Sequence, residues 1–250
     1  MDNIYEKSSL LSQYLLFHYG DNSFNMPYAF GPIESLNFPT KVLHENLNIG
    51  NLSEKKNALD IGCAVGRTSF ELSLYFEKVT GIDFSSNFIL TANQLKEGLT
   101  IPYSILVEGE HYANALAERP ELSNPKRISF QQGDATKLPS NIGSFDFVIA
   151  ANLICRLSKP EIFLERLPQL VNHGGTLLIS TPFTWLEDYT SKKRWLNKDK
   201  SSGLYGIKRY LEPFFALKQT KDIPFIIREH VRKFQWSVAQ CSVWERLENP

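Results

Sequence analysis

One short turn, Asp60-Ile-Gly-Cys-Ala-Val-Gly66, carries the clearest chemistry in the sequence. It follows an apolar run typical of a buried strand and precedes residues with helical spacing, so we predict a strand-to-helix turn. Glycines let the backbone turn tightly and come close to a ligand, and the next helix begins with N–H groups that lack intrahelical partners. We therefore expect a small molecule to bind at this turn.

The acidic residue at the start of the turn, Asp60, indicates the kind of ligand. Dinucleotides are bound by G-x-G-x-x-G, which holds a pyrophosphate, but here Ala64 replaces the middle glycine and a carboxylate precedes Gly62. A fixed negative charge repels phosphates and attracts a cation, such as the ammonium and sulfonium of S-adenosylmethionine. The turn favours a cationic nucleoside, and a dinucleotide-dependent oxidoreductase is disfavoured.

Polar residues follow the later strands in a matching order. Asp83 ends the second strand, where a carboxylate can accept hydrogen bonds from both ribose hydroxyls. Asp134 follows the third strand, where its carboxylate can accept a hydrogen bond from the adenine amino group. Taken singly, an aspartate at a strand end is usually a turn or helix cap. The ordered set favours a cofactor site, whose candidate residues are Asp60, Gly62, Cys63, Ala64, Gly66, Asp83, Phe84, Phe88, Asp134, Ala135, Ala151 and Asn152.

The elements that must position these residues alternate between strand and helix. The patterns predict strands at 57–61, 78–83, 128–132, 145–150 and 176–180, and helices at 67–76, 86–97 (with Ser85 as N-cap) and 160–170. Segments 222–234 and 240–247, joined at 235–239, predict an antiparallel hairpin. We expect an α/β fold: a Rossmann-like, mostly parallel seven-stranded sheet with helices on both faces and a C-terminal hairpin.

The whole chain, 1–250, is expected to be one domain. Residues 1–50 would form a cap, with helices at 4–19 and 41–50 around a loop at 20–40, and 51–250 would form the core. Residues 99–126 predict a long connection, and 182–202 predict a flap because they leave the edge where ligands bind in open parallel sheets.

Bulk composition excludes several classes of function. The 27 basic and 27 acidic residues balance, so no nucleic-acid partner is expected, and no apolar run is long enough to cross a membrane. Three scattered cysteines and the lack of a signal peptide favour a reduced cytoplasmic protein, and no His, Cys and carboxylate spacing predicts a metal site.

These features resemble the class I S-adenosylmethionine-dependent methyltransferases over residues 57–181. Segments outside that core are similar to a narrower family, the 4-mercaptohistidine N1-methyltransferases of ovothiol biosynthesis. The similar segments are Tyr14-Leu-Leu-Phe-His-Tyr-Gly20, Met26-Pro-Tyr28 with Gly31-Pro and Leu36-Asn-Phe-Pro39, Ser180-Thr-Pro-Phe-Thr-Trp-Leu-Glu187, Pro224-Phe-Ile-Ile-Arg-Glu229, and Arg232-Lys-Phe-Gln235.

The narrower resemblance implies a reaction. S-adenosylmethionine would methylate an imidazole nitrogen of 5-thiohistidine, giving ovothiol A and S-adenosylhomocysteine. The chain has no room for a sulfoxide-synthase domain, so it would be the single-domain form, with a functional link to a separate sulfoxide synthase that supplies a diffusing substrate.

A zwitterionic substrate needs a cation, an acceptor for its ammonium, and aromatic walls. The candidates for substrate binding are Tyr14, Tyr19, Tyr28, Arg156, Phe183, Trp185, Arg228, Glu229 and Arg232, with Tyr189 as a further aromatic wall. The catalytic candidates are His18, Asn152 and Tyr28. The alternation of Arg228 and Glu229 fits solvent-facing strand residues equally well. Two alternatives stay open: a methyltransferase for another small molecule (an amino acid, carboxylate or phenol), and a binding protein without activity.

Overall fold

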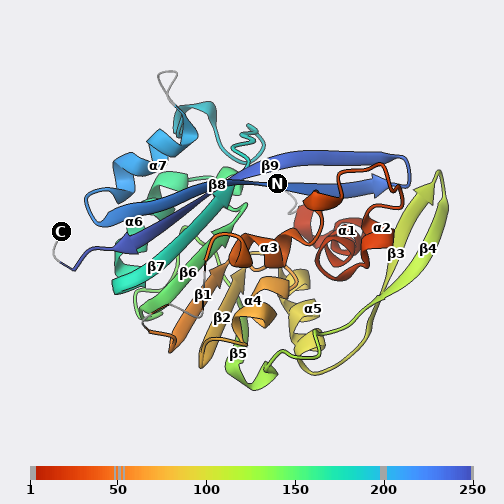
Figure 1. Cartoon of the computed structure of the whole chain (residues 1–250), viewed down its shortest axis with the longest axis horizontal. Coiled ribbons are helices and arrows are strands. Elements are labelled where there is room, and N and C mark those ends of the chain that lie inside the picture. The colour runs from red at the N-terminus through yellow and green to blue at the C-terminus, as the bar shows by residue number, and fades with distance from the viewer. Residues whose placement is uncertain (1–3, 48, 50–51, 53, 198–201, 249–250) are drawn as a thin grey trace.

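The computed structural model describes residues 4–47, 49, 52, 54–197 and 202–248. Its main sheet has seven strands in the order β5-β2-β1-β6-β7-β9-β8 (Figure 1). The strands are β1 (Asn57–Ile61), β2 (Lys78–Asp83), β5 (Ile128–Gln132), β6 (Phe145–Ala151), β7 (Val171–Thr181), β8 (Phe215–His230) and β9 (Lys233–Arg246). The first five run parallel, and β9 runs antiparallel to both β7 and β8. The predicted Rossmann-like sheet with a C-terminal antiparallel pair is confirmed.

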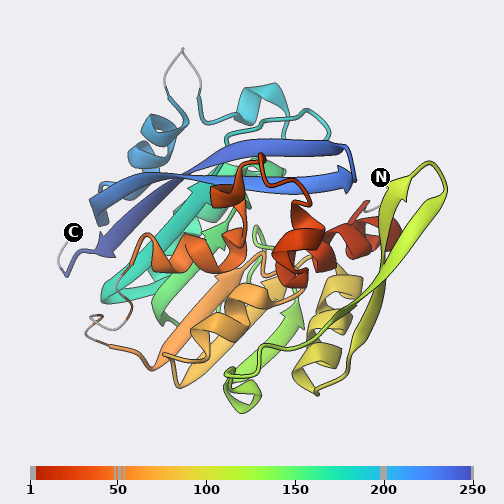
Figure 2. The same cartoon turned by 45° about the vertical axis from the view of Figure 1, so that its right-hand side comes forward.

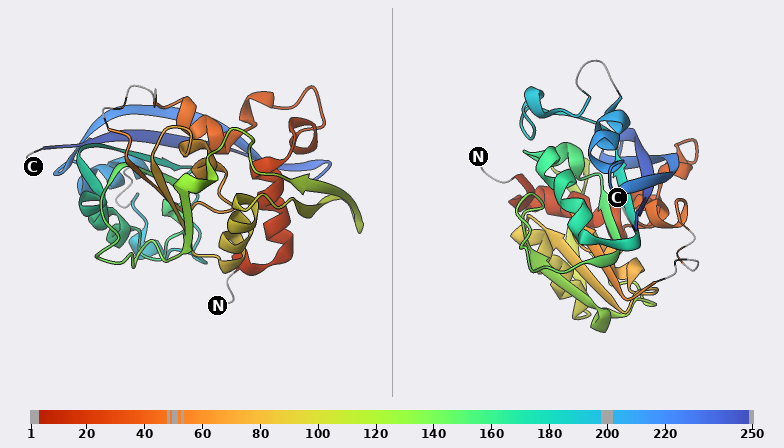
Figure 3. Two further views of the ribbon diagram at one scale, coloured as in Figure 1. Left: turned by 90° about the horizontal axis from the view of Figure 1, so that it is seen from below. Right: turned by 90° about the vertical axis from the view of Figure 1, so that its left-hand side faces the viewer.

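Alternate residues of β1 enter two different cores, as expected for a strand buried on both faces. Ala58 packs with α1 (Ser8–Tyr19), α3 (Phe38–His44), α4 (Arg67–Leu72) and α5 (Ser86–Lys96). Leu59 packs with α6 (Pro160–Leu170) and α7 (Gly203–Leu211) on the opposite face. The helices therefore cover both faces (Figure 3), and the carboxyl ends of the parallel strands are left to form a site.

The C-terminal hairpin is longer than predicted, and its turn is elsewhere. The turn lies at residues 231–232, between β8 and β9, and the predicted linker at 235–239 is paired strand, with Ile227 opposite Gln235 and Ile223 opposite Ala239. The prediction failed because polar residues of β9 face solvent, where the distal hairpin extends past the sheet (Figure 1). The start of β8 was also missed, because residues 218–222 are polar and exposed, as suits an edge strand.

Residues 99–126, predicted as a connection, contain a second small sheet. Strands β3 (Ile101–Glu108) and β4 (His111–Ala117) form an antiparallel hairpin that projects from one end of the molecule (Figure 2). Its base shares the core around α1 through four buried residues: Tyr103, Ile105, Ala115 and Ala117. The hairpin thus supports the N-terminal helix from outside the main sheet.

The N-terminal region differs from the expected pair of helices. The segment at 4–19 divides into a 3-10 turn, η1 (Ile4–Glu6), and α1, while α3 begins at Phe38 rather than residue 41. The expected loop also contains α2 (Asn22–Asn25) and a 3-10 turn, η2 (Ile33–Ser35). Residues 48 and 50 of the predicted second helix, and 198–201 of the predicted flap, lie outside the described residues. The described part of the flap contains a 3-10 turn, η6 (Lys192–Arg194).

Candidate functional site

The glycine turn after β1 has the backbone that its sequence requires. Gly62 and Gly66 have φ values of 78° and 88°, and Ala64 is also left-handed at 47°. A Cβ on Gly62 would come within 3.1 Å of Leu153 Cδ1, so this glycine keeps the turn close to the end of β6. Gly66 does not line the cavity; a Cβ there would lie 2.6 Å from the Phe130 ring, so its role is to pack the turn against β5.

Asp60 is a buried carboxyl at the end of β1, with 1% of its surface exposed. The Ser69 hydroxyl donates a hydrogen bond to it across 2.6 Å from α4. Burial raises the pKa of Asp60 to about 7, although the Ser69 bond acts against that shift. A cation bound beside it would favour the ionised form, because opposite charge lowers the pKa of a carboxyl.

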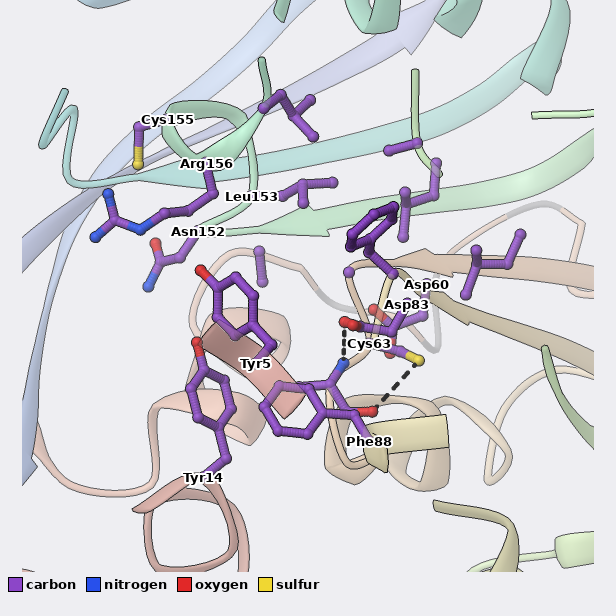
Figure 4. Close-up of a pocket in the computed structure, with 18 of the residues that line it drawn as sticks. Tyr5, Tyr14, Asp60, Cys63, Asp83, Phe88, Asn152, Leu153, Cys155 and Arg156 are labelled. Atoms are coloured by element: carbon purple, nitrogen blue, oxygen red, sulfur yellow. Dashed lines mark hydrogen bonds between the residues drawn. The ribbon is translucent and has the colours of Figure 1, made fainter. Parts of the chain in front are cut away.

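Asp83 is fixed at the end of β2 by two backbone groups. Its carboxylate accepts from the Ala64 N–H at 2.9 Å, the bond drawn to Asp83 in Figure 4, and from the Ser85 N–H at 2.9 Å. Burial raises its pKa, while these two N–H groups act in the opposite direction. Each oxygen keeps a further lone pair, so a carboxylate held in this way can still accept from ribose hydroxyls.

A cavity of about 490 Å³ connects these residues, within the roughly 300–1,000 Å³ range of small-molecule sites. Phe84, Asp134 and Ala135, which were expected around the adenine, line this cavity. Asp134 Oδ1 accepts from the N–H and hydroxyl of Thr136, which leaves Oδ2, 3.6 Å from Lys137 Nζ, on the opposite side of the carboxylate. The cavity also contains the predicted residues Asp60, Gly62, Cys63, Ala64, Phe88, Ala151 and Asn152.

The charges in this cavity suit a cationic nucleoside. Four aspartates line it (Asp60, Asp83, Asp134 and Asp188), whereas Arg156 is the one lysine or arginine among the described lining residues. Arg156 lies away from the Asp60 end (Figure 4). The residues present therefore fit S-adenosylmethionine, with acceptors at the ribose and a carboxyl near the expected position of its positive groups.

A compact polar corner lies at the carboxyl end of β6. Asn152, with φ 51°, shares a 3.2 Å hydrogen bond with the Ser180 hydroxyl. The Arg156 guanidinium lies 4.8 Å from the centre of the Tyr189 ring. Figure 4 shows the hydroxyls of Tyr5 and Tyr14 pointing toward Asn152 and Arg156. This group of residues, Tyr5, Tyr14, Asn152, Arg156 and Tyr189, is called the acceptor corner below.

His18 lines the same cavity from α1 and stacks on Tyr14, with ring centroids 5.9 Å apart. Burial lowers its pKa to about 3, and the positive charge of Arg67 acts in the same direction. Its Nδ1 is buried without a hydrogen-bond partner. A neutral imidazole of such low basicity is a weak candidate for accepting a proton near neutral pH.

Several residues expected to bind substrate lie outside the cavity, and packing explains each case. The Tyr19 hydroxyl donates to the Val65 carbonyl at 2.6 Å and so supports the glycine turn. Trp185 is buried in the core beside α6 and α7, and Phe183 packs against the same core. Tyr28 packs with Phe30 and Phe234 near the distal hairpin.

The charged residues of the hairpin are also outside the cavity. The Arg228 guanidinium donates to the carbonyls of Phe24 and Leu106, at 2.6 and 3.4 Å, and so joins three segments. Glu229 pairs with Lys233 at 2.6 Å, and Arg232 is exposed at the turn. The expected substrate roles of these hairpin charges are therefore not supported by where the side chains lie.

Other cavity residues were missed by sequence reasoning. Tyr5, Phe38, Phe225 and Ile227 all line the cavity. Tyr189, by contrast, was expected as an aromatic wall of the substrate site, and it does line the cavity. Nothing in the pattern around Tyr5 or Phe225 separates it from a core residue.

Two negative findings concern the described residues alone. No helix within them is long and apolar enough to cross a membrane. No group of three or more His, Cys, Asp or Glu side chains within them could hold a metal ion.

Together, the strand order, the glycine turn and the acidic cavity define a Rossmann-like domain with a site for a cationic nucleoside. Residues 59–179 match the family described as a methyltransferase domain. The fold is that of the class I S-adenosylmethionine-dependent methyltransferases.

Comparisons with individual proteins agree with this class. Two curated relatives are ajmaline N-methyltransferase and norajmaline N-methyltransferase of Rauvolfia serpentina, 27% and 26% identical over 50% and 56% of the chain. The matched region spans only 36% and 42% of these relatives.

Solved structures share the fold at low identity. The N-methyltransferase NodS from Bradyrhizobium japonicum, in complex with S-adenosylhomocysteine, has a TM-score of 0.54 at 14% identity, over 95% of this chain and 99% of that one. A methyltransferase from Methanosarcina mazei has a TM-score of 0.53 at 18% identity, over 80% and 96%.

Proposed function

We propose that the chain methylates a nitrogen of a small molecule, and that this acceptor is the imidazole of 5-thiohistidine, the product being ovothiol A. The observation that carries the proposal is the acceptor corner, which combines one guanidinium with aromatic walls inside an otherwise acidic cavity. The N-methyltransferases among the relatives support a nitrogen acceptor. The motifs shared with the 4-mercaptohistidine N1-methyltransferases support the imidazole.

In this proposal the corner binds the two ends of the substrate differently. Arg156 binds the carboxylate, since its guanidinium presents several N–H donors. Within the described part of the chain, it donates one hydrogen bond, from Nη1 to the Thr184 carbonyl at 3.0 Å. Tyr14, Tyr5 and Phe88 form walls for the ring, with Tyr14 and Phe88 centred 4.7 Å apart. This part of the wall is rigid because Phe88 is 1% exposed.

In this proposal Asn152 lies where the methyl donor and the substrate meet. Its amide oxygen accepts from Ser180, so its amide N–H groups are left to donate to a substrate. Bound S-adenosylmethionine supplies an electrophilic methyl group, which leaves sulfur as the ring nitrogen forms its new bond. The protein's main contribution is to hold nitrogen and methyl in line and close.

The proton lost from the ring does not require a strong base in the protein. A thiolate-bearing imidazole is electron-rich, and water can take the proton after transfer. We assign His18 to hydrogen bonding in its neutral form, because its pKa of about 3 leaves it little basicity.

The proposal also concerns the setting of the reaction. The substrate would arrive by diffusion from a separate sulfoxide synthase, and the cytoplasm would be the compartment, since Cys63, Cys155 and Cys241 are all unpaired.

The test is turnover with a panel of acceptors. Purified protein is incubated with methyl-labelled S-adenosylmethionine and, separately, 5-thiohistidine, histidine and simple phenols. We expect label in 5-thiohistidine alone. Label in histidine or a phenol, without label in 5-thiohistidine, would replace this substrate with the alternative of another amino acid, carboxylate or phenol.

A further inference from the structure

The N-terminal 3-10 turn, η1, is clasped to the beginning of α5. The Glu6 carboxylate accepts from the N–H and hydroxyl of Ser86, at 2.9 and 3.0 Å, and from the Asn87 N–H at 3.3 Å. The Asn87 amide donates in return to the Glu6 carbonyl at 2.9 Å. A carboxylate at this position satisfies N–H groups in the first turn of the helix and interacts well with its dipole.

This clasp lies beside the turn that carries the ribose acceptor. Ser85 donates its N–H to Asp83 at 2.9 Å and its hydroxyl to the Tyr5 carbonyl at 3.1 Å. The same serine caps α5 through a bond from the Phe88 N–H. One residue therefore connects the cofactor site to the segment that presents Tyr5.

The clasp directs the Tyr5 side chain into the acceptor corner. The Tyr5 ring lies 6.2 Å from that of Tyr14, 5.9 Å from that of Phe88 and 6.5 Å from that of Tyr189, between centroids. Its ring also lies beside that of Tyr189, and the Arg156 guanidinium lies over the Tyr189 ring. Tyr5 thus joins the two aromatic walls and stands next to the guanidinium (Figure 4).

We propose that Tyr5 determines acceptor specificity by donating a hydrogen bond to the anionic group that Arg156 binds, and that Glu6 is the positioning residue that holds Tyr5 in the corner. The inference rests on the proposed function, because it requires an acceptor that carries a carboxylate or thiolate. The inference adds Tyr5 to the acceptor site. Tyr5 lies on η1, which is outside the Rossmann-like core.

The geometry also separates the two effects on binding. Asp83 has its own bonds from Ala64 and Ser85, so losing the clasp leaves the ribose acceptor in place. Loss of Tyr5 or Glu6 should therefore weaken acceptor binding more than cofactor binding. A general destabilisation of the fold would instead weaken both.

The test uses the full chain with Tyr5→Phe, Glu6→Ala, Glu6→Gln and the double variant, and Tyr112→Phe as the matched control on an exposed strand. We expect Tyr5→Phe to raise the KM for 5-thiohistidine about tenfold, as loss of a hydrogen bond to a charged group does, with kcat and the Kd for S-adenosylhomocysteine nearly unchanged. Glu6→Ala should raise KM similarly, and Glu6→Gln less. The double variant should resemble either single one, because both act on one group.

Two outcomes separate failure of this inference from failure of the proposed function. If the unmodified chain methylates no member of the acceptor panel, the proposed function fails, and the specificity role of Tyr5 fails with it. If it methylates 5-thiohistidine but Tyr5→Phe has an unchanged KM, only the inference is overturned.

A measurement without acceptor tests the clasp itself. Hydrogen exchange of residues 4–7 is compared with and without S-adenosylhomocysteine. Protection of this segment that Glu6→Ala abolishes is the expected result, and equal exchange in Glu6→Ala and the unmodified chain would overturn the clasp.

Discussion

The Ser69 hydroxyl lies 2.6 Å from Asp60 Oδ2 and donates to it, from the helix that follows the glycine turn back to the strand that precedes it. The hydrogen bond favours the carboxylate, but burial has the larger effect and raises the pKa of Asp60 to about 7. In the free protein this residue therefore titrates near neutrality. A positively charged ligand must shift it to the ionised form, so cofactor binding is linked to proton release.

Cofactor affinity should accordingly depend on pH. Above about pH 7 Asp60 is already ionised, whereas below that value each unit of pH should weaken S-adenosylmethionine binding by up to about tenfold, because a proton must be displaced. Isothermal titration between pH 5.5 and 8.5, in buffers of different ionisation enthalpy, would measure both the affinity and the released proton. An affinity that is constant over this range would contradict the linkage.

Asp60→Asn should weaken cofactor binding and stabilise the fold. The folded-state pKa of Asp60 is above its unfolded value of 3.8, so its contribution to stability is full below about pH 4 and is lost as pH rises through about 7. At pH 8 the neutral amide should raise the free energy of unfolding by on the order of 1–4 kcal/mol, with little change at pH 4. Thermal unfolding of the ligand-free protein at both pH values tests the sign, and cofactor affinity at pH 8 should fall.

Asp83→Ala should weaken cofactor binding at every pH. It removes a half-buried acceptor that is oriented by the Ala64 and Ser85 N–H groups, and we expect a loss of about 1–3 kcal/mol, typical of a hydrogen bond to a charged group. The Kd for S-adenosylhomocysteine is the measurement. Glu54→Ala, at an exposed ion pair with Lys56, is the control, and an equal affinity for the two variants would reject Asp83 as a cofactor ligand.

The sequence predicted the cofactor half of the site better than the acceptor half, and the reason is physical. Asp60, Asp83 and Asn152 lie at the ends of parallel strands, so their order along the chain already predicts that they meet at one edge of the sheet. The acceptor corner instead needs η1 and the segment after β7 to fold over that edge. Their positions depend on tertiary contacts such as the Glu6 clasp, which leave no periodic pattern.

The C-terminal hairpin is a second case in which tertiary contacts decide where side chains point. Charged residues near its turn suggested a substrate site, but the turn was placed at 235–239 rather than 231–232, so the direction in which Arg228 points could not be predicted. The side chains of a strand that extends beyond the sheet point alternately toward solvent and toward the elements that cover the strand. Here the covering elements are α2, β3 and η2, whose contacts with β8 the sequence pattern does not predict.

Alanine variants of two glycines should distinguish the effect of backbone strain on stability from a loss of cofactor binding. Gly62 and Gly98 have similar φ values, 78° and 86°, but a Cβ at Gly98 meets nothing within 4 Å. Alanine at either position should cost about 1 kcal/mol of stability for its left-handed backbone. Only Gly62→Ala, and more strongly Gly62→Val, should lower the affinity for S-adenosylhomocysteine. Equal affinities for the alanine variants would mean that the turn does not contact the cofactor.

Arg156 and Arg228 provide the sharpest test of which arginine serves the substrate. Arg228 is 7% exposed and donates to the carbonyls of Phe24 and Leu106, so Arg228→Gln should lower the free energy of unfolding by about 1–3 kcal/mol, the usual cost of leaving buried polar groups unsatisfied. The KM of the folded fraction should stay close to that of the unmodified chain. Arg156 makes one backbone bond and faces the cavity, so Arg156→Gln should leave stability nearly unchanged and raise the KM for 5-thiohistidine by at least about tenfold. Unfolding in urea and steady-state kinetics on the two variants give four numbers. If the KM rises in Arg228→Gln and does not rise in Arg156→Gln, the substrate's anionic group binds at the hairpin and not in the acceptor corner.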